Sequence, residues 1–278
     1  MVNAVKRVLV FDSGVGGLSV LDAIASSDAL LELDYLADNA WLPYGLKSDA
    51  QLRERVPALL ARVGADWAPD LIVVACNTAS TIALEAVRAA LTVPIVGVVP
   101  PIKPAVALTR TGVIGLLATP ATVQRPYTNE LIAQFAAGKR VVRLGSAALV
   151  EAAERKLAGA SESEITQAAV QACAELFGAP GGAEIDVVAL ACTHFPLLAR
   201  ELAAAAPRPC VWLDSGEAIA RRVRQLLIAP PGEPRLRQAG FTEAEAMRPA
   251  FPAFQARGFT HLQSVGPAPY FSTAPADF

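Results

Sequence analysis

The sequence lacks an apolar run long enough to cross a membrane, although 53% of its 278 residues are hydrophobic. A spanning helix needs about 20 consecutive apolar residues, whereas these residues fall in short Val, Leu and Ile runs and in Ala-rich helical patterns. Residues 1–6 also lack the basic start and long apolar stretch of a secretory signal. These absences predict a soluble, cytoplasmic protein with no membrane partner.

An excess of charge of one sign is also missing. The chain has 24 Lys and Arg against 26 Asp and Glu, a formal net charge of -2. Proteins that bind nucleic acid are usually strongly basic, and disordered chains combine high net charge with few apolar residues. The composition therefore predicts an ordered globular protein for which nucleic acid is not the primary ligand.

Cysteine and histidine are scarce, with four and two residues, and no C-x-x-C spacing occurs. Zinc ribbons, redox motifs and disulfide frameworks are therefore not indicated, and we expect free thiols. Cys173 and Cys210 lie in apolar surroundings typical of packing residues. Cys192 and His194 alternate along the chain, but no further ligands follow at a metal-binding spacing, so we expect no metal.

Short β-type runs alternate with helical patterns along the chain. This alternation predicts an α/β fold with parallel sheets covered by helices on both faces. Ser48 and Gln51 form a predicted capping box before an amphipathic helix. The predicted strands are 8–11, 35–37, 71–75, 95–98, 113–117, 141–144, 187–191 and 211–213.

Two proline-rich stretches predict the domain organisation. Clustered prolines favour extended or turn conformations and often lie where domains meet, as they do near 94–104 and 207–209. We therefore predict a first domain from residues 1–98 plus 211–266 and a second from 99–210. Residues 267–278 are expected to form a weakly ordered tail.

A short sequence pattern recurs in both predicted domains. VVACNT at 73–78 is matched by VALACTH at 188–194, and Asp-Ser-Gly at 12–14 is matched at 214–216. Asp-Ser-Gly is common in turns, so the cysteine match is the stronger one. Each of these cysteines follows an apolar strand, which suggests two related halves.

The carboxyl ends of parallel strands form the usual ligand crevice, which makes Cys76 and Cys192 candidates for chemistry. Free cysteine is ordinarily a packing residue, but here polar residues follow both thiols at a helix start, where an anion can bind. Asp12 fits either a turn or a site, and His194 either a structural or a functional histidine. His261 is expected to be structural.

Three cofactors are not supported by the sequence. The glycine run at 14–17 breaks G-x-G-x-x-G at its last position, and no Walker lysine follows it, which argues against NAD and ATP. Pyridoxal phosphate requires a Schiff-base lysine, and no lysine here lies in a characteristic motif. The sequence therefore favours acid–base chemistry by the two thiols, without a cofactor.

Four motifs in this order closely resemble the glutamate racemases of the aspartate/glutamate racemase family. They are residues 11–20 (FDSGVGGLSV), 43–45 (PYG), 75–80 (ACNTAS) and 192–198 (CTHFPLL). The resemblance extends to about residue 266, and VGVVP at 96–100, IKP at 102–104 and LGS at 144–146 resemble the proteobacterial branch. It implies two α/β domains related by a pseudo-twofold axis, with the active site at their interface.

The resemblance also implies the roles of individual residues. Cys76 and Cys192 would face opposite sides of the glutamate α-carbon as acid and base, with Asp12 assisting Cys76 and His194 and Glu154 on the Cys192 side. The reaction, conversion of L- to D-glutamate for peptidoglycan, would need no cofactor. Substrate-binding residues would be Asp12, Ser13, Pro43, Tyr44, Gly45, Asn77, Thr78, Thr119, Thr122, Thr193 and His194.

Two alternative functions remain open at this point. The first is a racemase of aspartate or another amino acid, because the sequence does not define the side-chain pocket. The second is a binding protein on the same fold that inhibits DNA gyrase, although such a protein would have no use for both thiols. The resemblance further implies a possible homodimer, and Glu151 stands where the family commonly has proline.

Overall fold

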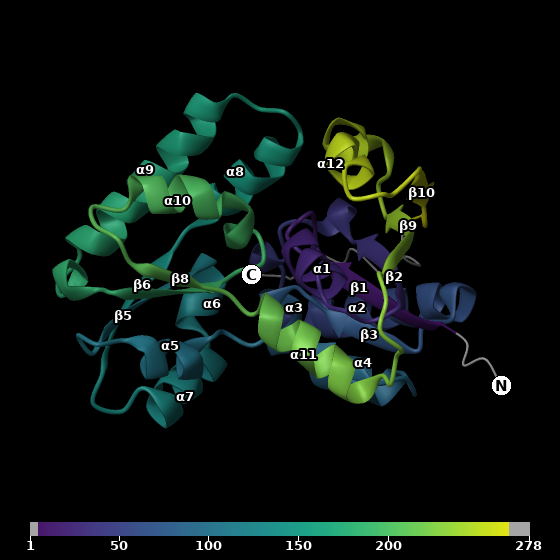
Figure 1. Cartoon of the computed structure of the whole chain (residues 1–278), viewed down its shortest axis with the longest axis horizontal. Helices are drawn as coiled ribbons and strands as arrows, with labels where there is room; N and C mark the ends of the chain where they lie inside the picture. Colours follow the sequence, from purple (N-terminus) through teal and green to yellow (C-terminus); the bar gives the residue numbers. More distant parts are fainter. Residues whose placement is uncertain (1–4, 267–278) are drawn as a thin grey trace, which may run out of the picture.

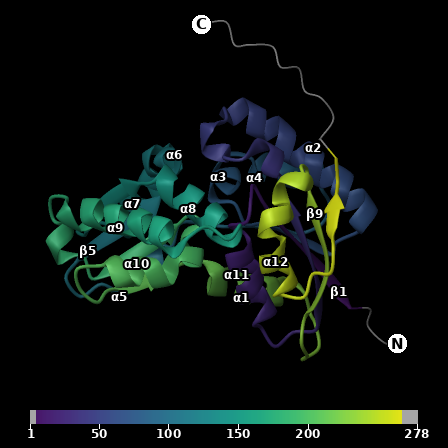
Figure 2. The same ribbon diagram turned by 90° about the horizontal axis from the view of Figure 1, so that it is seen from above.

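The chain forms two α/β lobes, side by side, each built on a fully parallel sheet (Figures 1 and 2). The structure is a computed structural model and describes residues 5–266. Helices cover both faces of both sheets, so the predicted architecture is confirmed. The predicted tail at 267–278 lies outside the described residues.

The first lobe contains a six-stranded sheet in the order β10-β9-β2-β1-β3-β4. Helices α1 (Leu18–Ala25), α11 (Gly216–Leu226) and α12 (Phe251–Gln255) pack on one face. Helices α2 (Asp49–Trp67), α3 (Asn77–Ile82) and α4 (Leu84–Ala90) pack on the other. The strands are β1 (Lys6–Asp12), β2 (Leu31–Ala37), β3 (Leu71–Val74), β4 (Ile95–Gly97), β9 (Arg235–Phe241) and β10 (Leu262–Ser264).

The second lobe contains a four-stranded sheet in the order β6-β5-β7-β8. Helices α8 (Ala147–Leu157), α9 (Glu162–Gly178) and α10 (Ala199–Ala205) pack on one face. Helices α5 (Ile102–Leu108), α6 (Pro120–Gln124) and α7 (Pro126–Phe135) pack on the other. The strands are β5 (Val113–Ala118), β6 (Arg140–Gly145), β7 (Val187–Ala191) and β8 (Val211–Leu213).

Short 3₁₀ helices occupy several connections. They are η1 (Asn39–Trp41), η2 (Tyr44–Leu46), η3 (Gly182–Glu184), η4 (Phe195–Leu198) and η5 (Glu245–Ala250). Within the part of the chain that the structure describes, no helix is both long enough and apolar enough to span a membrane.

Both lobes share one strand order. The first four strands of the chain run β2-β1-β3-β4, and the next four run β6-β5-β7-β8. Cys76 follows β3 and Cys192 follows β7, the third strand of each set, so the cysteine recurrence marks equivalent positions. The Asp-Ser-Gly recurrence does not, because Asp12 ends the first strand of its set whereas Asp214 follows the fourth, β8.

The second crossing between the lobes lies later than the prolines at 207–209 suggest. Strand β8 pairs with β7 in the second sheet, so the chain leaves this lobe only after Leu213. We propose to end the second domain there rather than at residue 210. The hydroxyl of Ser215 donates to the carbonyl of Val99 (2.8 Å), which joins the two crossings directly.

Strand β9 was not predicted from the sequence, whereas the eight predicted strands are all present. The sequence of β9, RLRQAGF, carries charges that a strand buried in an apolar layer would not have. In the structure Arg237 pairs with Asp34 (3.2 Å) and Glu32 (3.4 Å) on the neighbouring β2. Cross-strand ion pairs of this kind replace the usual alternation of apolar residues.

Helix α2 begins with the predicted capping box. The side chain of Ser48 accepts from the Gln51 backbone N–H (3.2 Å), and the Ser48 N–H donates to Gln51 Oε1 (3.0 Å). These bonds satisfy two backbone N–H groups, those of Ser48 and Gln51, that would otherwise be left to water at the start of the helix. The apolar face of α2 packs on the sheet through Leu52, Val56 and Leu59, among others.

Replacing Ser48 by Ala should lower the free energy of unfolding by about 1 kcal/mol, because the side-chain acceptor of the cap is lost. Equilibrium denaturation in urea measures the effect. Ser161→Ala is the matched control, since Ser161 caps α9 without a side-chain capping bond and donates to Glu164 instead. Equal losses in the two variants would contradict the assignment.

Candidate active site

A cavity of about 380 Å³ lies between the two lobes, at the carboxyl ends of strands from both sheets. Parallel sheets bind ligands at this end, where the strand-to-helix loops converge. Both Cys76 and Cys192 line this one cavity, each 6% exposed or less. The other lining residues are Ser13, Leu42, Pro43, Tyr44, Gly45, Leu46, Asn77, Thr78, Thr119, Pro120, Ala121, Ala147, Val150, Glu151, Glu154, Thr193 and His194.

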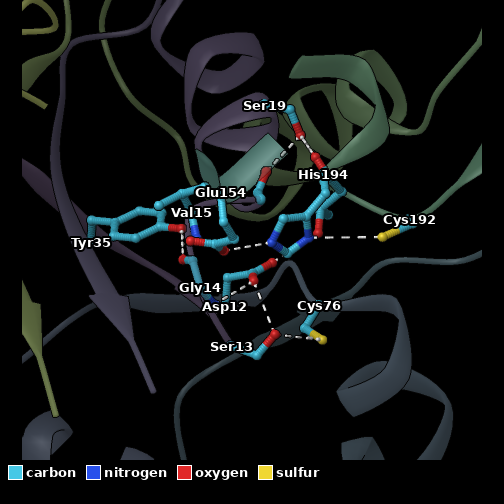
Figure 3. Close-up of polar contacts among 12 residues, drawn as sticks. Asp12, Ser13, Gly14, Val15, Ser19, Tyr35, Cys76, Glu154, Cys192 and His194 are labelled. Carbon is cyan, nitrogen blue, oxygen red and sulfur yellow. Dashed lines mark hydrogen bonds and ion pairs between the residues drawn. The ribbon is translucent and has the colours of Figure 1, made fainter. Parts of the chain in front are cut away.

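Cys192 contacts a histidine–carboxylate pair, in which His194 is buried and Glu154 is partly buried (Figure 3). Its sulfur lies 3.8 Å from His194 Nδ1, and His194 Nε2 lies 2.7 Å from Glu154 Oε1. Burial lowers the pKa of His194, but its hydrogen bonds with Cys192 and Glu154 outweigh burial and raise this pKa well above its ordinary value. A protonated imidazole carries N–H donors on both ring nitrogens, so Nδ1 can donate to the sulfur of Cys192 while Nε2 donates to Glu154.

Cys76 has a different environment. Its sulfur lies 3.6 Å from Ser13 Oγ, and this hydroxyl donates to Asp12 Oδ1 (3.3 Å). Burial, and after it the negative charge of Asp12, raises the pKa of Cys76 to about 12. At neutral pH Cys76 therefore keeps its proton, and Asp12 reaches it through Ser13.

Asp12 and Thr122 lie behind the cavity wall. Asp12 is fully buried and connects the lobes, because its Oδ2 accepts from the hydroxyl of Thr193 (2.9 Å). Thr122 is also fully buried, and its backbone N–H donates to Thr119 Oγ1 (3.2 Å) at the start of α6. The other residues expected to bind substrate all line the cavity.

The glycine run at 14–17 lets the second lobe approach closely. A Cβ atom at Gly14 would collide with Glu154 Oε1, and one at Gly16 would collide with the ring of His194. At Gly17 it would lie 2.7 Å from Cβ of Asp12. These glycines therefore leave room for the carboxylates and the histidine rather than for a phosphate group.

A buried ion pair, which was not found from the sequence, supports the connection after β2 that contains Tyr44; we call this connection, residues 38–47, the Tyr44 loop. Arg55 donates to both oxygens of Asp38 (2.6 and 2.7 Å), and both side chains are at most 5% exposed. Asp38 also accepts from the hydroxyls of Tyr44 (2.7 Å) and Thr242 (2.9 Å). With its hydroxyl engaged there, Tyr44 can offer the cavity its ring and its backbone.

Asn77 and Glu151 are two further polar side chains of the cavity wall. Oδ1 of Asn77 is buried and has no hydrogen-bond partner in the described structure, so it can accept from a bound ligand. Glu151 lines the cavity beside Glu154, but Glu154 is the carboxylate that contacts His194. Among residues 5–266, no group of three or more His, Cys, Asp or Glu side chains could hold a metal ion.

The apolar part of the wall was also missed from the sequence. Two of its members lie in the connection that follows β2, and four lie in helices α6 and α8, which follow β5 and β6. They carry no motif of their own, so only the fold brings them together. They are Leu42, Leu46, Pro120, Ala121, Ala147 and Val150.

The family comparison assigns this two-lobed fold, with a thiol from each lobe in one cavity, to a class of isomerases, the racemases. The chain belongs to the Asp/Glu/Hydantoin racemase family, whose model matches residues 19–223.

Within this family, the chain is similar to several proteins named glutamate racemase. A glutamate racemase of Sphingopyxis alaskensis is 52% identical over 79% of this chain and 81% of its own length. One of Pectobacterium carotovorum is 47% identical over 93% of this chain and 90% of its own. The solved structure of Escherichia coli glutamate racemase with L-glutamate and the activator UDP-MurNAc-Ala matches with a TM-score of 0.83 and 42% identity, over 94% of this chain and 98% of that one.

At pH 7, iodoacetamide should alkylate Cys192 faster than Cys76, by about 10-fold or more, because the thiolate is the reactive form and the raised pKa of Cys76 keeps that residue as a thiol. Mass spectrometry of the two peptides measures the ratio. Gly16→Ala should reduce this ratio, since the added Cβ displaces the His194 ring. Gly64→Ala is the control, because nothing lies within 4 Å of a Cβ added there. Faster alkylation of Cys76 in the unaltered protein would contradict the assignment.

Proposed function

We propose that this protein interconverts L- and D-glutamate without a cofactor, with Cys76 and Cys192 as opposed acid and base. The observation that supports this most is that one thiol from each lobe lines the same cavity. The relatives named glutamate racemase support the substrate. In the cell, the product would be D-glutamate for peptidoglycan, made in the cytoplasm.

The reaction requires a proton to leave one face of the α-carbon and another to arrive at the opposite face. One group cannot reach both faces, so two are needed, and they must start in opposite protonation states. In the proposed reaction Cys76 starts as the thiol, which is supported by the burial and the Asp12 charge that raise its pKa to about 12, and Cys192, beside His194, starts as the thiolate.

In this protonation state Cys192 takes the α-proton from one enantiomer while Cys76 gives its proton to the other face. The substrate gains and loses one proton, so its composition is unchanged. The protein is left with a Cys76 thiolate and a Cys192 thiol, which is the starting state for the opposite enantiomer. His194 and Glu154 stabilise one end of this cycle, and Ser13 with Asp12 the other.

No lysine or arginine of residues 5–266 lines the cavity, so a bound dicarboxylate would be held mainly by neutral donors. Hydroxyls and backbone N–H groups at the loop ends would hold the carboxylates, as anions are held at helix starts. The unpartnered Oδ1 of Asn77 would accept from the substrate ammonium group. The binding groups would come from Ser13, Pro43, Tyr44, Gly45, Asn77, Thr78, Thr119 and Thr193.

The two alternative functions have less support. An aspartate racemase would use the same thiols, but relatives covering up to 93% of this chain are named for glutamate. A gyrase-inhibiting binding protein would not need two buried thiols with separate polar partners in one cavity. A homodimer remains a prediction from the sequence resemblance.

Cys76→Ser and Cys192→Ser should each lower racemisation by about 1,000-fold, in the range ascribed to general acid–base groups. Each variant should still exchange the α-proton of one enantiomer with solvent, because one thiol can take and return a proton on its own face. Polarimetry and ¹H NMR in D₂O measure the two processes. Cys173→Ser is the control, since Cys173 packs in the core of the second lobe. Full racemisation by either active-site variant would rule out the two-thiol reaction.

Asp12→Asn should move the alkaline limb of the kcat/KM profile to lower pH. The charge of Asp12 raises the pKa of Cys76, after burial. Without that charge the pKa falls, and the Cys76 proton needed for the reaction is lost at lower pH. Initial rates with glutamate across alkaline pH measure the shift. Asp70→Asn, which removes a charge paired with Lys6 at the protein surface, should leave the limb in place; an unmoved limb in Asp12→Asn would contradict the role of Asp12.

A further inference from the structure

Tyr35 is a fully buried residue of β2 that takes no part in the reaction described above. Its ring packs edge-on against Phe254, with ring centres 5.3 Å apart. Its hydroxyl donates to the carbonyl of Gly14 (2.6 Å), in the glycine loop beside the site. Burial, and after it the charges of Asp12 and Glu154, raises the pKa of Tyr35 well above its ordinary value, so the hydroxyl remains a donor.

The carbonyl that Tyr35 contacts belongs to the same peptide unit as the N–H of Val15. This N–H donates to Glu154 Oε1 (2.9 Å) in the other lobe. A peptide unit is planar, and in the trans form its C=O and N–H point in opposite directions. Fixing the carbonyl of Gly14 therefore fixes the direction in which the Val15 N–H meets Glu154.

From Glu154 the contacts continue to Cys192. Glu154 Oε1 lies 2.7 Å from His194 Nε2, and His194 Nδ1 lies 3.8 Å from the sulfur of Cys192. Figure 3 shows this chain running from the Tyr35 ring through the Gly14 peptide and the imidazole to the sulfur. Hydrogen bonds in such a buried chain polarise one another, so a donor at one end acts on the other end.

Cys76 is not on this chain. Its polar contact is with Ser13, and Ser13 contacts Asp12. Asp12 accepts from the N–H of Gly14 (2.9 Å), which belongs to the preceding peptide unit and not to the one that Tyr35 holds. The two thiols thus depend on different peptide groups of the same loop.

We propose that Tyr35 is a positioning residue for the Cys192 half of the site: its hydroxyl orients the Gly14 peptide, which aligns Glu154 and through it the His194 ring beside the sulfur. The inference rests on the proposed two-thiol reaction. If Tyr35 served only to pack against Phe254, phenylalanine would replace it without loss. If it supported the loop in general, its replacement would slow the reactions of both thiols alike.

The test introduces Tyr35→Phe into the two single-cysteine backgrounds. In Cys76→Ser, exchange of the α-proton reports on Cys192, and in Cys192→Ser it reports on Cys76. Tyr35→Phe should slow the first exchange by about 10-fold, the effect of a lost hydrogen bond in a buried network, and the second by less than about 2-fold. ¹H NMR in D₂O with each enantiomer of glutamate measures both rates.

Equal slowing in the two backgrounds, or none with Cys192, would overturn the proposal. Tyr127→Phe is the matched control: it removes a tyrosine hydroxyl from α7, outside the cavity, and should change neither rate.

A second measurement needs no turnover. In the protein with both cysteines, Tyr35→Phe should lower the alkylation of Cys192 by iodoacetamide several-fold relative to Cys76. An unchanged alkylation ratio would also overturn the proposal. If neither single-cysteine variant exchanges an α-proton, the two-thiol reaction itself fails, and the alkylation ratio still decides whether Tyr35 acts on Cys192.

Discussion

The contact between the glycine loop at 14–17 and the pair Glu154–His194 is the constraint on which the site depends. The two lobes meet there closely enough that a Cβ atom at Gly14 would collide with Glu154, and one at Gly16 with the His194 ring. The hydrogen bonds from Val15 to Glu154 and from Thr193 to Asp12 lie at the same junction. Because each lobe contributes one thiol, the spacing of the sulfurs is set by this interlobe contact and not by either sheet alone.

The polar groups at this junction are buried, and most of their hydrogen-bonding capacity is used within the protein. Unpaired buried groups are costly, so the few that remain are informative. Oδ1 of Asn77 is one of them, and it lies in the cavity wall. The Asp38–Arg55 pair shows the opposite arrangement, because both oxygens of Asp38 are hydrogen-bonded within the protein, to Arg55, Tyr44 and Thr242.

The local features of this structure could be predicted from the sequence, and the features made by distant residues could not. The strands before Cys76 and Cys192 are short apolar runs, and the cap at Ser48 needs only four residues, so both are visible locally. Arg55, Asp38 and Thr242 lie far apart in the chain and form a network only after folding. Tyr35 resembles any core residue of a strand, because nothing in the sequence shows where its hydroxyl points. Strand β9 was missed because ion pairs with β2 replace its apolar pattern.

The two halves of the site are alike in topology but not in chemistry. Both thiols follow the third strand of the same strand order, yet one faces a serine and a carboxylate and the other an imidazole. Enantiomers have equal free energy, so an enzyme interconverting them must have the same kcat/KM in both directions. Any kinetic difference between the two halves must therefore change kcat and KM for one enantiomer by the same factor relative to the other. The enantiomer with the lower KM must also have the lower kcat, by the same ratio.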